Sequence, residues 1–332
     1  MKWMLSTEVK PLSPPISYRD SILMVGSCFT ENMAGYLRDH KFSVMDNPQG
    51  ILFNPVSVLS CLQRMSDCRQ VTENDLFFYN DCYHSWEHHG EFSSPRIDDC
   101  LDVINSSTVQ AHRFLKNAGM LVITLGSAWV YQLTEMAPLY QPGKVVANNH
   151  QAPANWFQKE LLQPATIVDA FAAWLTPLLQ NKPGLRVLLT VSPVRHLREG
   201  TIQNNLSKAV LLQAVHQLAS MFEGVHYFPA YELVVDDLRD YRFYAEDLVH
   251  PNYQATKYVW ENWVKACVDD ESRDIMAAVK DIRLAFQHTP LHPDTARHQN
   301  FLKEYARKTI ELMAAHPWLK LEDELAYFSS AE

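Results

Sequence analysis

A carboxylate and an imidazole stand three residues apart in the stretch Asp247-Leu-Val-His250-Pro251. On a loop, Asp247 can bend back and accept a hydrogen bond from Nδ1 of His250. That bond fixes the tautomer of the ring and leaves Nε2 free to take a proton. The same spacing also arises in surface turns and in half of a metal site. The pair therefore indicates acid–base chemistry only if a nucleophile lies beside it.

Ser27 is the candidate nucleophile because of its place in the pattern. The apolar run 21–25 ends at Gly26, and a helical pattern follows Ser27 directly. Its hydroxyl would then stand at the carboxyl edge of a sheet, where open α/β sheets bind ligands, beside the positive end of a helix. A serine here can also serve simply as a helix N-cap. Cys28 is an alternative nucleophile or a small packed residue.

Short β-rich runs alternate with longer helical stretches, which predicts a parallel sheet with helices on both faces. Two segments, 73–95 and 128–156, interrupt the alternation; we expect them to be excursions from the strand ends that help to build the site. Beyond Cys267, apolar residues recur at helical spacing. We therefore expect a main domain over 1–268 and a helical extension over 269–332. The expected strands are 21–25, 42–45, 121–125, 186–191 and 224–228.

Composition narrows the class of protein. The 332 residues carry a formal net charge of -9, and 47 % of them are hydrophobic. Lysines and arginines are scattered, which argues against a nucleic-acid surface. Six cysteines without a CxxC pair suggest free thiols in a reducing cytoplasm. With no signal-like or bilayer-length apolar run, we expect a cytoplasmic protein that has no membrane partner and no cofactor.

The two chemical stretches together resemble the GDSL/SGNH hydrolases, which carry a serine after the first strand and Asp-x-x-His near the domain end. The form Gly26-Ser-Cys-Phe29 is similar to the GSCFA family within that group. The resemblance runs from Ser21 to Trp263. Further blocks similar to that family are 49–55, 124–131, 145–150, 191–196 and 239–247.

This resemblance implies a three-layer α/β/α sandwich around a five-stranded parallel, flavodoxin-like sheet. Ser27 would attack an ester carbonyl, His250 would take its proton, and Asp247 would orient His250. An acyl-enzyme would form and be cleared by water. No Gly-x-Ser-x-Gly elbow surrounds Ser27, which disfavours the α/β-hydrolase fold.

The resemblance also implies that backbone N–H groups of Ser27 and Gly50 bind the oxyanion. SGNH enzymes usually add an asparagine donor after the third strand, but this chain has Ala128 at that position. Asn54 or Asn149 could supply the missing donor.

Other residues at the expected edge are candidates for lining a substrate pocket. His84 and His88, with His89 and Glu87, invite a metal interpretation, but Ser85-Trp86 and Gly90 do not favour a helix there, so we expect no metal. The candidate substrate-binding residues are Cys28, Ser127, Asn149, His150, Arg195 and His196.

The sequence thus predicts a serine esterase that acts on a small-molecule or carbohydrate ester, with an acetyl ester as a family-level suggestion. Acyl transfer to a sugar or another alcohol would use the same triad. A non-catalytic binding protein is a third hypothesis, motivated by Ala128 and the helical tail. The sequence does not indicate an oligomeric state.

Overall fold

The computed structural model describes residues 6–329. Its centre is a parallel five-stranded sheet with strand order β2-β1-β5-β8-β9. Each predicted strand is present, and its ends differ from the prediction by at most one residue. The strands are β1 (Ser21–Gly26), β2 (Ser43–Asp46), β5 (Met120–Leu125), β8 (Arg186–Val191) and β9 (Val225–Tyr227).

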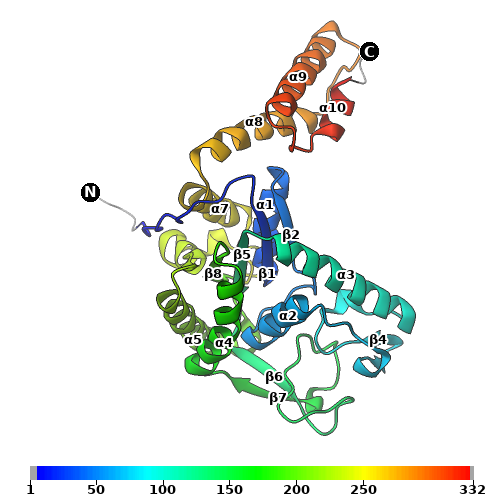
Figure 1. Cartoon of the computed structure of the whole chain (residues 1–332), viewed down its shortest axis with the longest axis vertical. Helices are drawn as coiled ribbons and strands as arrows, with labels where there is room; N and C mark the ends of the chain where they lie inside the picture. Colours follow the sequence, from blue (N-terminus) through cyan, green and yellow to red (C-terminus); the bar gives the residue numbers. More distant parts are fainter. Residues whose placement is uncertain (1–5, 330–332) are drawn as a thin grey trace.

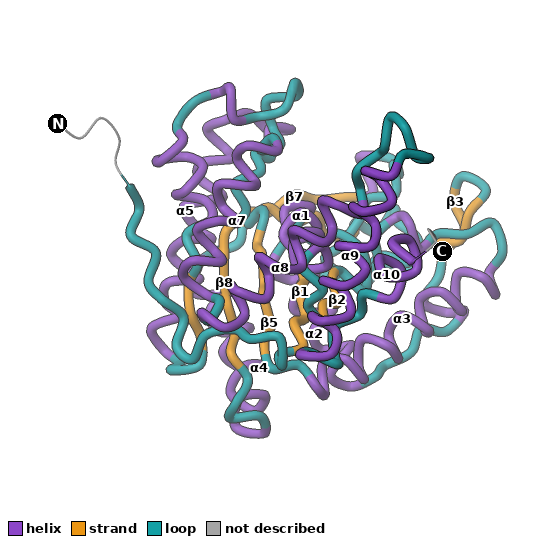
Figure 2. The backbone as a smooth tube through the Cα atoms, turned by 90° about the horizontal axis from the view of Figure 1, so that it is seen from above, coloured by secondary structure: helices purple, strands orange, loops and turns teal. Residues whose placement is uncertain are grey.

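Helices cover both faces of this sheet, as Figure 2 shows. Side chains alternate along each strand, so Ile22 and Met24 enter one apolar cluster while Leu23 and Val25 enter the other. The first cluster includes α1 (Cys28–Asp39) and α7 (Tyr253–Cys267). The predicted three-layer sandwich is therefore confirmed. Helices of the second cluster are α2 (Pro55–Asp67), α3 (Ile97–Asn117), α4 (Pro164–Asn181) and α5 (Gly200–Met221).

Both predicted excursions contain a strand of an antiparallel hairpin. β3 (Phe77–Tyr79) pairs with β4 (Cys82–His84), and β6 (Trp129–Leu133) pairs with β7 (Phe157–Leu161). In Figure 1 the second hairpin lies at the end of the molecule opposite α9 and α10. Short helical turns fill other connections: Glu73–Asp75, Gly90–Phe92, Ala154–Trp156, Leu197–Glu199, Ala230–Glu232, Leu233–Leu238 and Tyr241–Phe243.

The tail forms three helices, α8 (Asp270–Phe286), α9 (Ala296–Ala315) and α10 (Glu322–Ser329), which project from the sheet in Figure 1. α8 buries Ile275 and Val279 in the same cluster as α1 and α7. Lys41, which follows α1, reaches Glu324 of α10 at 2.7 Å. The helical extension therefore shares a core with one face of the main sandwich.

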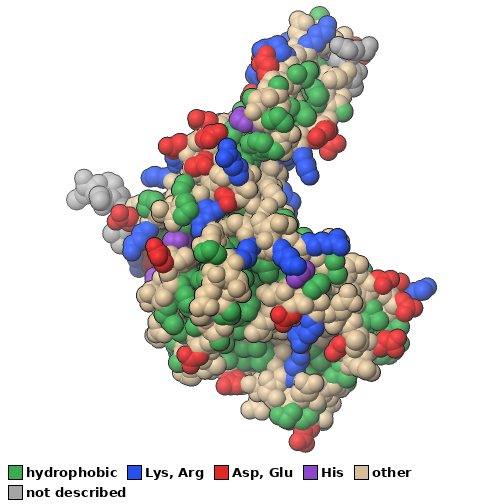
Figure 3. Space-filling view, in the orientation of Figure 1, with side chains coloured by type: hydrophobic (Ala, Val, Ile, Leu, Met, Phe, Trp, Pro, Cys, Tyr) green, Lys and Arg blue, Asp and Glu red, His purple; other side chains and the backbone are tan. Residues whose placement is uncertain are grey.

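Charged side chains of both signs are interspersed over the face in Figure 3. No continuous basic stripe covers that face, in keeping with the formal net charge of -9. Across residues 6–329, none of the helices combines the length and the apolar character needed to cross a membrane.

The turn after β1 depends on Gly26. Its φ is +152°, and a Cβ at this position would overlap the carbonyl oxygen of Thr124 on β5. The N–H of Gly26 donates to Asn47 Oδ1 at 2.9 Å, and its carbonyl accepts from Leu52 N at 3.0 Å. This close approach of two backbones fixes the point where Ser27 leaves the sheet.

A buried lysine ties the carboxyl ends of the two central strands together. Lys208 of α5 is 1 % exposed, and its Nζ donates to the carbonyl of Gly126 at 2.6 Å and to that of Ser192 at 2.7 Å. No carboxylate among the described residues forms an ion pair with it. Burial lowers the pKa of Lys208 to about 7, because a charged ammonium is costly to keep away from water.

We expect Gly26→Ala to destabilise the protein by more than about 1 kcal/mol, because the new methyl group overlaps Thr124 at a backbone angle that alanine rarely adopts. Gly35→Ala is the matched control. A Cβ at Gly35 meets open space within α1, so alanine should stabilise the helix by up to about 1 kcal/mol. Urea unfolding of both variants measures the difference; equal stabilities would refute the close approach at Gly26.

The stability conferred by residue 208 should depend on pH. Below about pH 7, Lys208 is charged in both folded and unfolded states, and the folded state carries the full penalty. Between about 7 and the ordinary value of 10.5, the unfolded chain binds more protons, so stability rises with pH. The free energy of unfolding of the wild type, relative to Lys208→Met, should therefore increase from pH 6.5 to pH 9.5.

Urea unfolding at both pH values tests this, with Lys257→Met as the exposed control. A difference between wild type and Lys208→Met that stays constant with pH would contradict a buried charge at this position.

Candidate functional site

Asp247 and His250 form the predicted pair. Oδ2 of Asp247 lies 2.6 Å from Nδ1 of His250, and Oδ1 accepts from the backbone N–H groups of Val249 and His250 at 2.9 and 3.0 Å. The side-chain hydrogen bond to His250, followed by these backbone bonds, lowers the pKa of Asp247 to about 2. Nε2 of His250 has no hydrogen-bond partner in the described part of the chain. The pair is thus arranged to accept a proton at Nε2.

A tight loop presents this pair. Tyr244 and Pro251 form an antiparallel bridge, and Ala245 N donates to the carbonyl of His250 at 2.7 Å. Arg195, just past β8, donates its N–H to the carbonyl of Val249 at 3.1 Å. The loop is therefore fastened to the carboxyl edge of the sheet. The side chains of Asp247 and His250 are nevertheless about half exposed, at 48 % and 50 %.

Ser27 lies at the end of β1 and is 1 % exposed. Its position is the N-cap of α1, but its side chain makes no capping bond, and the buried Oγ has no hydrogen-bond partner among the described residues. A helix-capping role therefore does not explain why a hydroxyl is buried at this position. The bond between Ser27 and His250 that a working triad needs is absent in this conformation.

The expected oxyanion donors are already engaged, so they do not form an open hole here. The N–H of Ser27 donates to Thr124 O at 3.2 Å, and that of Gly50 donates to Asn47 O at 2.7 Å. Asn54 caps α2: its Oδ1 accepts from Ser57 N, and its Nδ2 donates to Ser57 Oγ, both at 2.9 Å. Local turn and cap geometry uses these donors in this conformation, so their expected role at the oxyanion stays a prediction.

Ser127 and Ala128 lie just before β6 and are held there by hydrogen bonds and apolar packing. Oγ of Ser127 lies 3.2 Å from Oγ of Ser207, which accepts from Ala128 N at 2.7 Å. Ala128 is fully buried in the second apolar cluster. The position where SGNH enzymes carry asparagine is therefore packed with apolar side chains, and Ser127 bonds within the protein.

His150 belongs to an aromatic cluster under the two hairpins, together with Phe77, His84 and Trp86. Nε2 of His150 lies 2.9 Å from the carbonyl of Ser85, and burial lowers the pKa of the ring to about 4. Its neighbour Asn149 is half-buried. The structure thus places His150 in a packed aromatic environment.

Of the histidines considered for a metal, His84 has both ring nitrogens engaged, whereas Nε2 of His88 and Nδ1 of His89 are buried without a hydrogen-bond partner among the described residues. Both ring nitrogens of His84 lie near oxygens, Ser93 Oγ at 2.7 Å and Tyr79 O at 2.9 Å. Glu87 forms ion pairs with Arg64 and Lys144. Within residues 6–329, no group of three potential metal ligands is found.

Three of the expected pocket residues do lie at the carboxyl edge. The guanidinium of Arg195 lies over the ring of Tyr244, 4.1 Å from its centroid. Burial, followed by the charge of Glu31, raises the pKa of the Cys28 thiol, which disfavours its nucleophilic thiolate form. His196 packs on Phe53, and its buried Nε2 has no partner among the described residues.

Sequence reasoning missed Lys208, although a signal for it exists. Lys208 shares the buried face of α5 with Asn204, Leu211 and Val215, which lie four, three and seven residues away. A lysine in such an apolar stripe has to be satisfied or functional. Lys208 and His196 influence each other electrostatically, and so do His196 and His250. These three side chains therefore belong to one neighbourhood.

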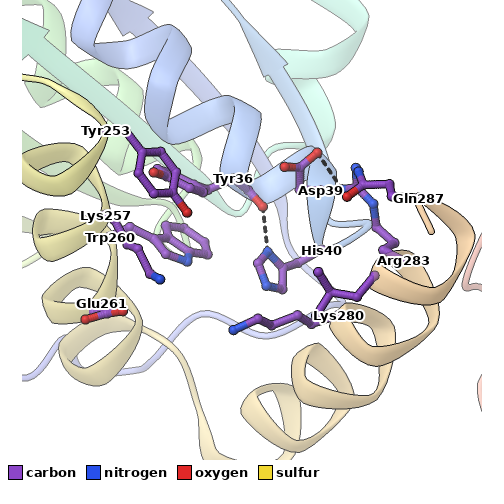
Figure 4. A pocket seen from close by; sticks show the side chains of 11 residues that line it. Tyr36, Asp39, His40, Tyr253, Lys257, Trp260, Glu261, Lys280, Arg283 and Gln287 are labelled. Atoms are coloured by element: carbon purple, nitrogen blue, oxygen red, sulfur yellow. Dashed lines mark hydrogen bonds and ion pairs between the residues drawn. The ribbon is translucent and has the colours of Figure 1, made fainter. Parts of the chain in front are cut away.

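A cavity of about 240 Å³ lies between α1, α7 and α8. Figure 4 shows Tyr253, Lys257 and Trp260 of α7 on one side, and Lys280 and Arg283 of α8 on the other. None of the predicted site residues lines it. This cavity belongs to the junction with the tail and is distinct from the Ser27 edge.

Comparison with known proteins agrees with this arrangement of motifs. A model of the GSCFA family matches residues 21–263. A second model, described as the C-terminal domain of GSCFA domain proteins, matches residues 279–331. No curated protein matches the chain. Because the first match covers more than half of the sequence, the chain belongs to the GSCFA family.

Proposed function

We propose that this protein is a serine acyl-ester hydrolase of the SGNH type. The Asp247–His250 pair carries the proposal: it holds a free Nε2 on a loop fastened beside the end of β8. Two observations support Ser27 as its partner. The hydroxyl is buried without a hydrogen bond, and it follows the first strand of a parallel sheet, at the edge where such sheets bind ligands.

In the proposed reaction, Ser27 Oγ forms a bond to the ester carbonyl carbon while its proton passes to Nε2 of His250. The carbonyl π electrons move to the oxygen and make an oxyanion. When they return, the bond to the alcohol breaks, and that alcohol takes the proton from His250. Water repeats the sequence and releases the acid. Asp247, ionised above about pH 2, stabilises the imidazolium in both halves.

The difference in exposure between the partners implies a movement. Ser27 is 1 % exposed, whereas the side chain of His250 is 50 % exposed, and the two are not bonded. Substrate binding would shift the 244–251 loop or the segment over Ser27, and would bring Nε2 to Oγ. Such tightening on binding is common in enzymes whose apo geometry is loose.

The same closed setting favours a second candidate, acyl transfer to a sugar or other alcohol, because a buried Ser27 restricts the access of water to an acyl-enzyme. Product analysis with and without an added alcohol separates the two. Ester products in the presence of the alcohol indicate transfer, and free acid alone indicates hydrolysis. We infer a small-molecule or carbohydrate ester as substrate, in a cytoplasmic protein.

A fluorophosphonate probe should label Ser27. The probe reports an activated serine because Oγ must lose its proton to a base as it bonds phosphorus and fluoride leaves. We expect an adduct on Ser27 by peptide mass mapping, absent in Ser27→Ala and reduced at least 100-fold in rate in His250→Ala.

Asp247→Asn tests the orienting role, with Asp240→Asn as the control on the preceding loop. The first should slow labelling about 10-fold or more, because the amide cannot stabilise imidazolium, and the second should leave it unchanged. An adduct on Cys28 would reassign the nucleophile. No adduct on either residue would support a binding protein instead.

A further inference from the structure

Three buried polar groups near Gly126 lack a full set of partners. Oγ of Ser27 and Nε2 of His196 have none among the described residues. The ammonium of Lys208 has three N–H donors, of which two are used by Gly126 and Ser192. Unpaired buried polar atoms cost roughly 1–3 kcal/mol each, so a cluster of them calls for an explanation.

Gly126 connects these groups. It lies two residues after Thr124, whose carbonyl accepts a hydrogen bond from Ser27 N. The carbonyl of Gly126 accepts a hydrogen bond from Lys208. A methyl group at Gly126 would lie 2.9 Å from Nε2 of His196. Glycine therefore leaves the space into which Nε2 points.

His196 is held firmly at this position. Its ring centroid lies 5.2 Å from that of Phe53, and its backbone N–H donates to Asn204 Oδ1 at 2.8 Å. Phe53 is fixed in turn, because its carbonyl accepts from Gly126 N and Ser127 N at 2.8 and 3.0 Å. A donor that is fixed before the reaction is what oxyanion stabilisation requires.

Given the proposed function, on which this inference rests, we propose that His196 is a further catalytic residue. Its Nε2–H donates to the oxyanion formed on Ser27, in place of the asparagine that Ala128 cannot supply. Lys208 is a positioning residue, which fixes the ends of β5 and β8 and whose positive charge acts on the imidazole of His196.

The electrostatic environment of His196 favours a role as hydrogen-bond donor over a role as general base. Burial, followed by the charge of Lys208, lowers the pKa of His196 to about 3. The ring therefore stays neutral at physiological pH and keeps one N–H, as neutral imidazoles that polarise carbonyls do. His250, half exposed and paired with Asp247, keeps the role of base.

The rate constant for labelling of Ser27 by a fluorophosphonate tests this without knowledge of the substrate, because a phosphonyl oxygen occupies the oxyanion position. We expect His196→Phe to lower this rate constant about 10²–10³-fold. His196→Gln, which restores an N–H donor, should recover part of the loss. The exposed His216→Phe is the control and should react like the wild type. Thermal unfolding should show His196→Phe folded, since it removes an unsatisfied polar atom.

The Lys208→Met variant tests whether Lys208 positions the proposed site or only stabilises the fold. Loss of the charge should raise the titration midpoint of His196, measured by NMR of the labelled imidazole, and slow the labelling of Ser27. A folded His196→Phe that labels Ser27 within threefold of the wild type would overturn the role of His196 while leaving the hydrolase proposal intact. Absence of an adduct on Ser27 in the wild type would overturn both.

Discussion

The ammonium of Lys208 at the carboxyl edge of the sheet is the constraint on which the arrangement depends. It joins the carbonyls of Gly126 and Ser192, and so fixes where β5 and β8 end relative to each other. A buried charge without a carboxylate is expensive, and an apolar side chain of similar size would pack at lower cost. Its presence at the edge that also carries Ser27 fits the proposed reaction, in which negative charge would develop there.

The strands and connections around Lys208 each position a different part of the proposed site. β1 ends at Gly26, where contact with Thr124 sets the exit of the chain and aims Ser27 out of the sheet. β8 continues into the segment that carries Arg195 and His196, and Arg195 fastens the loop of Asp247 and His250. The proposed nucleophile Ser27 is thus buried, while the side chains of Asp247 and His250 are half exposed. This difference agrees with the proposal that substrate binding brings the base to the nucleophile.

Much of this could be predicted from sequence because it depends on local patterns. Continuous apolar runs located the five strands, and Asp-x-x-His located the pair, since residues three apart can bond within one turn. The roles of Gly50 and Asn54 could not be read in this way. Their donors are consumed by contacts with Asn47 and Ser57 that only the turn and the helix cap create. Helical spacing places Lys208 on the buried face of α5, but its two carbonyl partners and the orphaned Nε2 of His196 depend on contacts between separate elements, which periodicity does not encode.

The most direct measurement is a crystal structure of the protein after reaction with the fluorophosphonate. We expect phosphorus bonded to Ser27 Oγ, a phosphonyl oxygen about 3 Å from Nε2 of His196, and Nε2 of His250 moved to hydrogen-bond distance of Ser27 Oγ. Phosphorus on another residue, or on Ser27 with His250 still turned to solvent, would contradict a catalytic site built from these side chains.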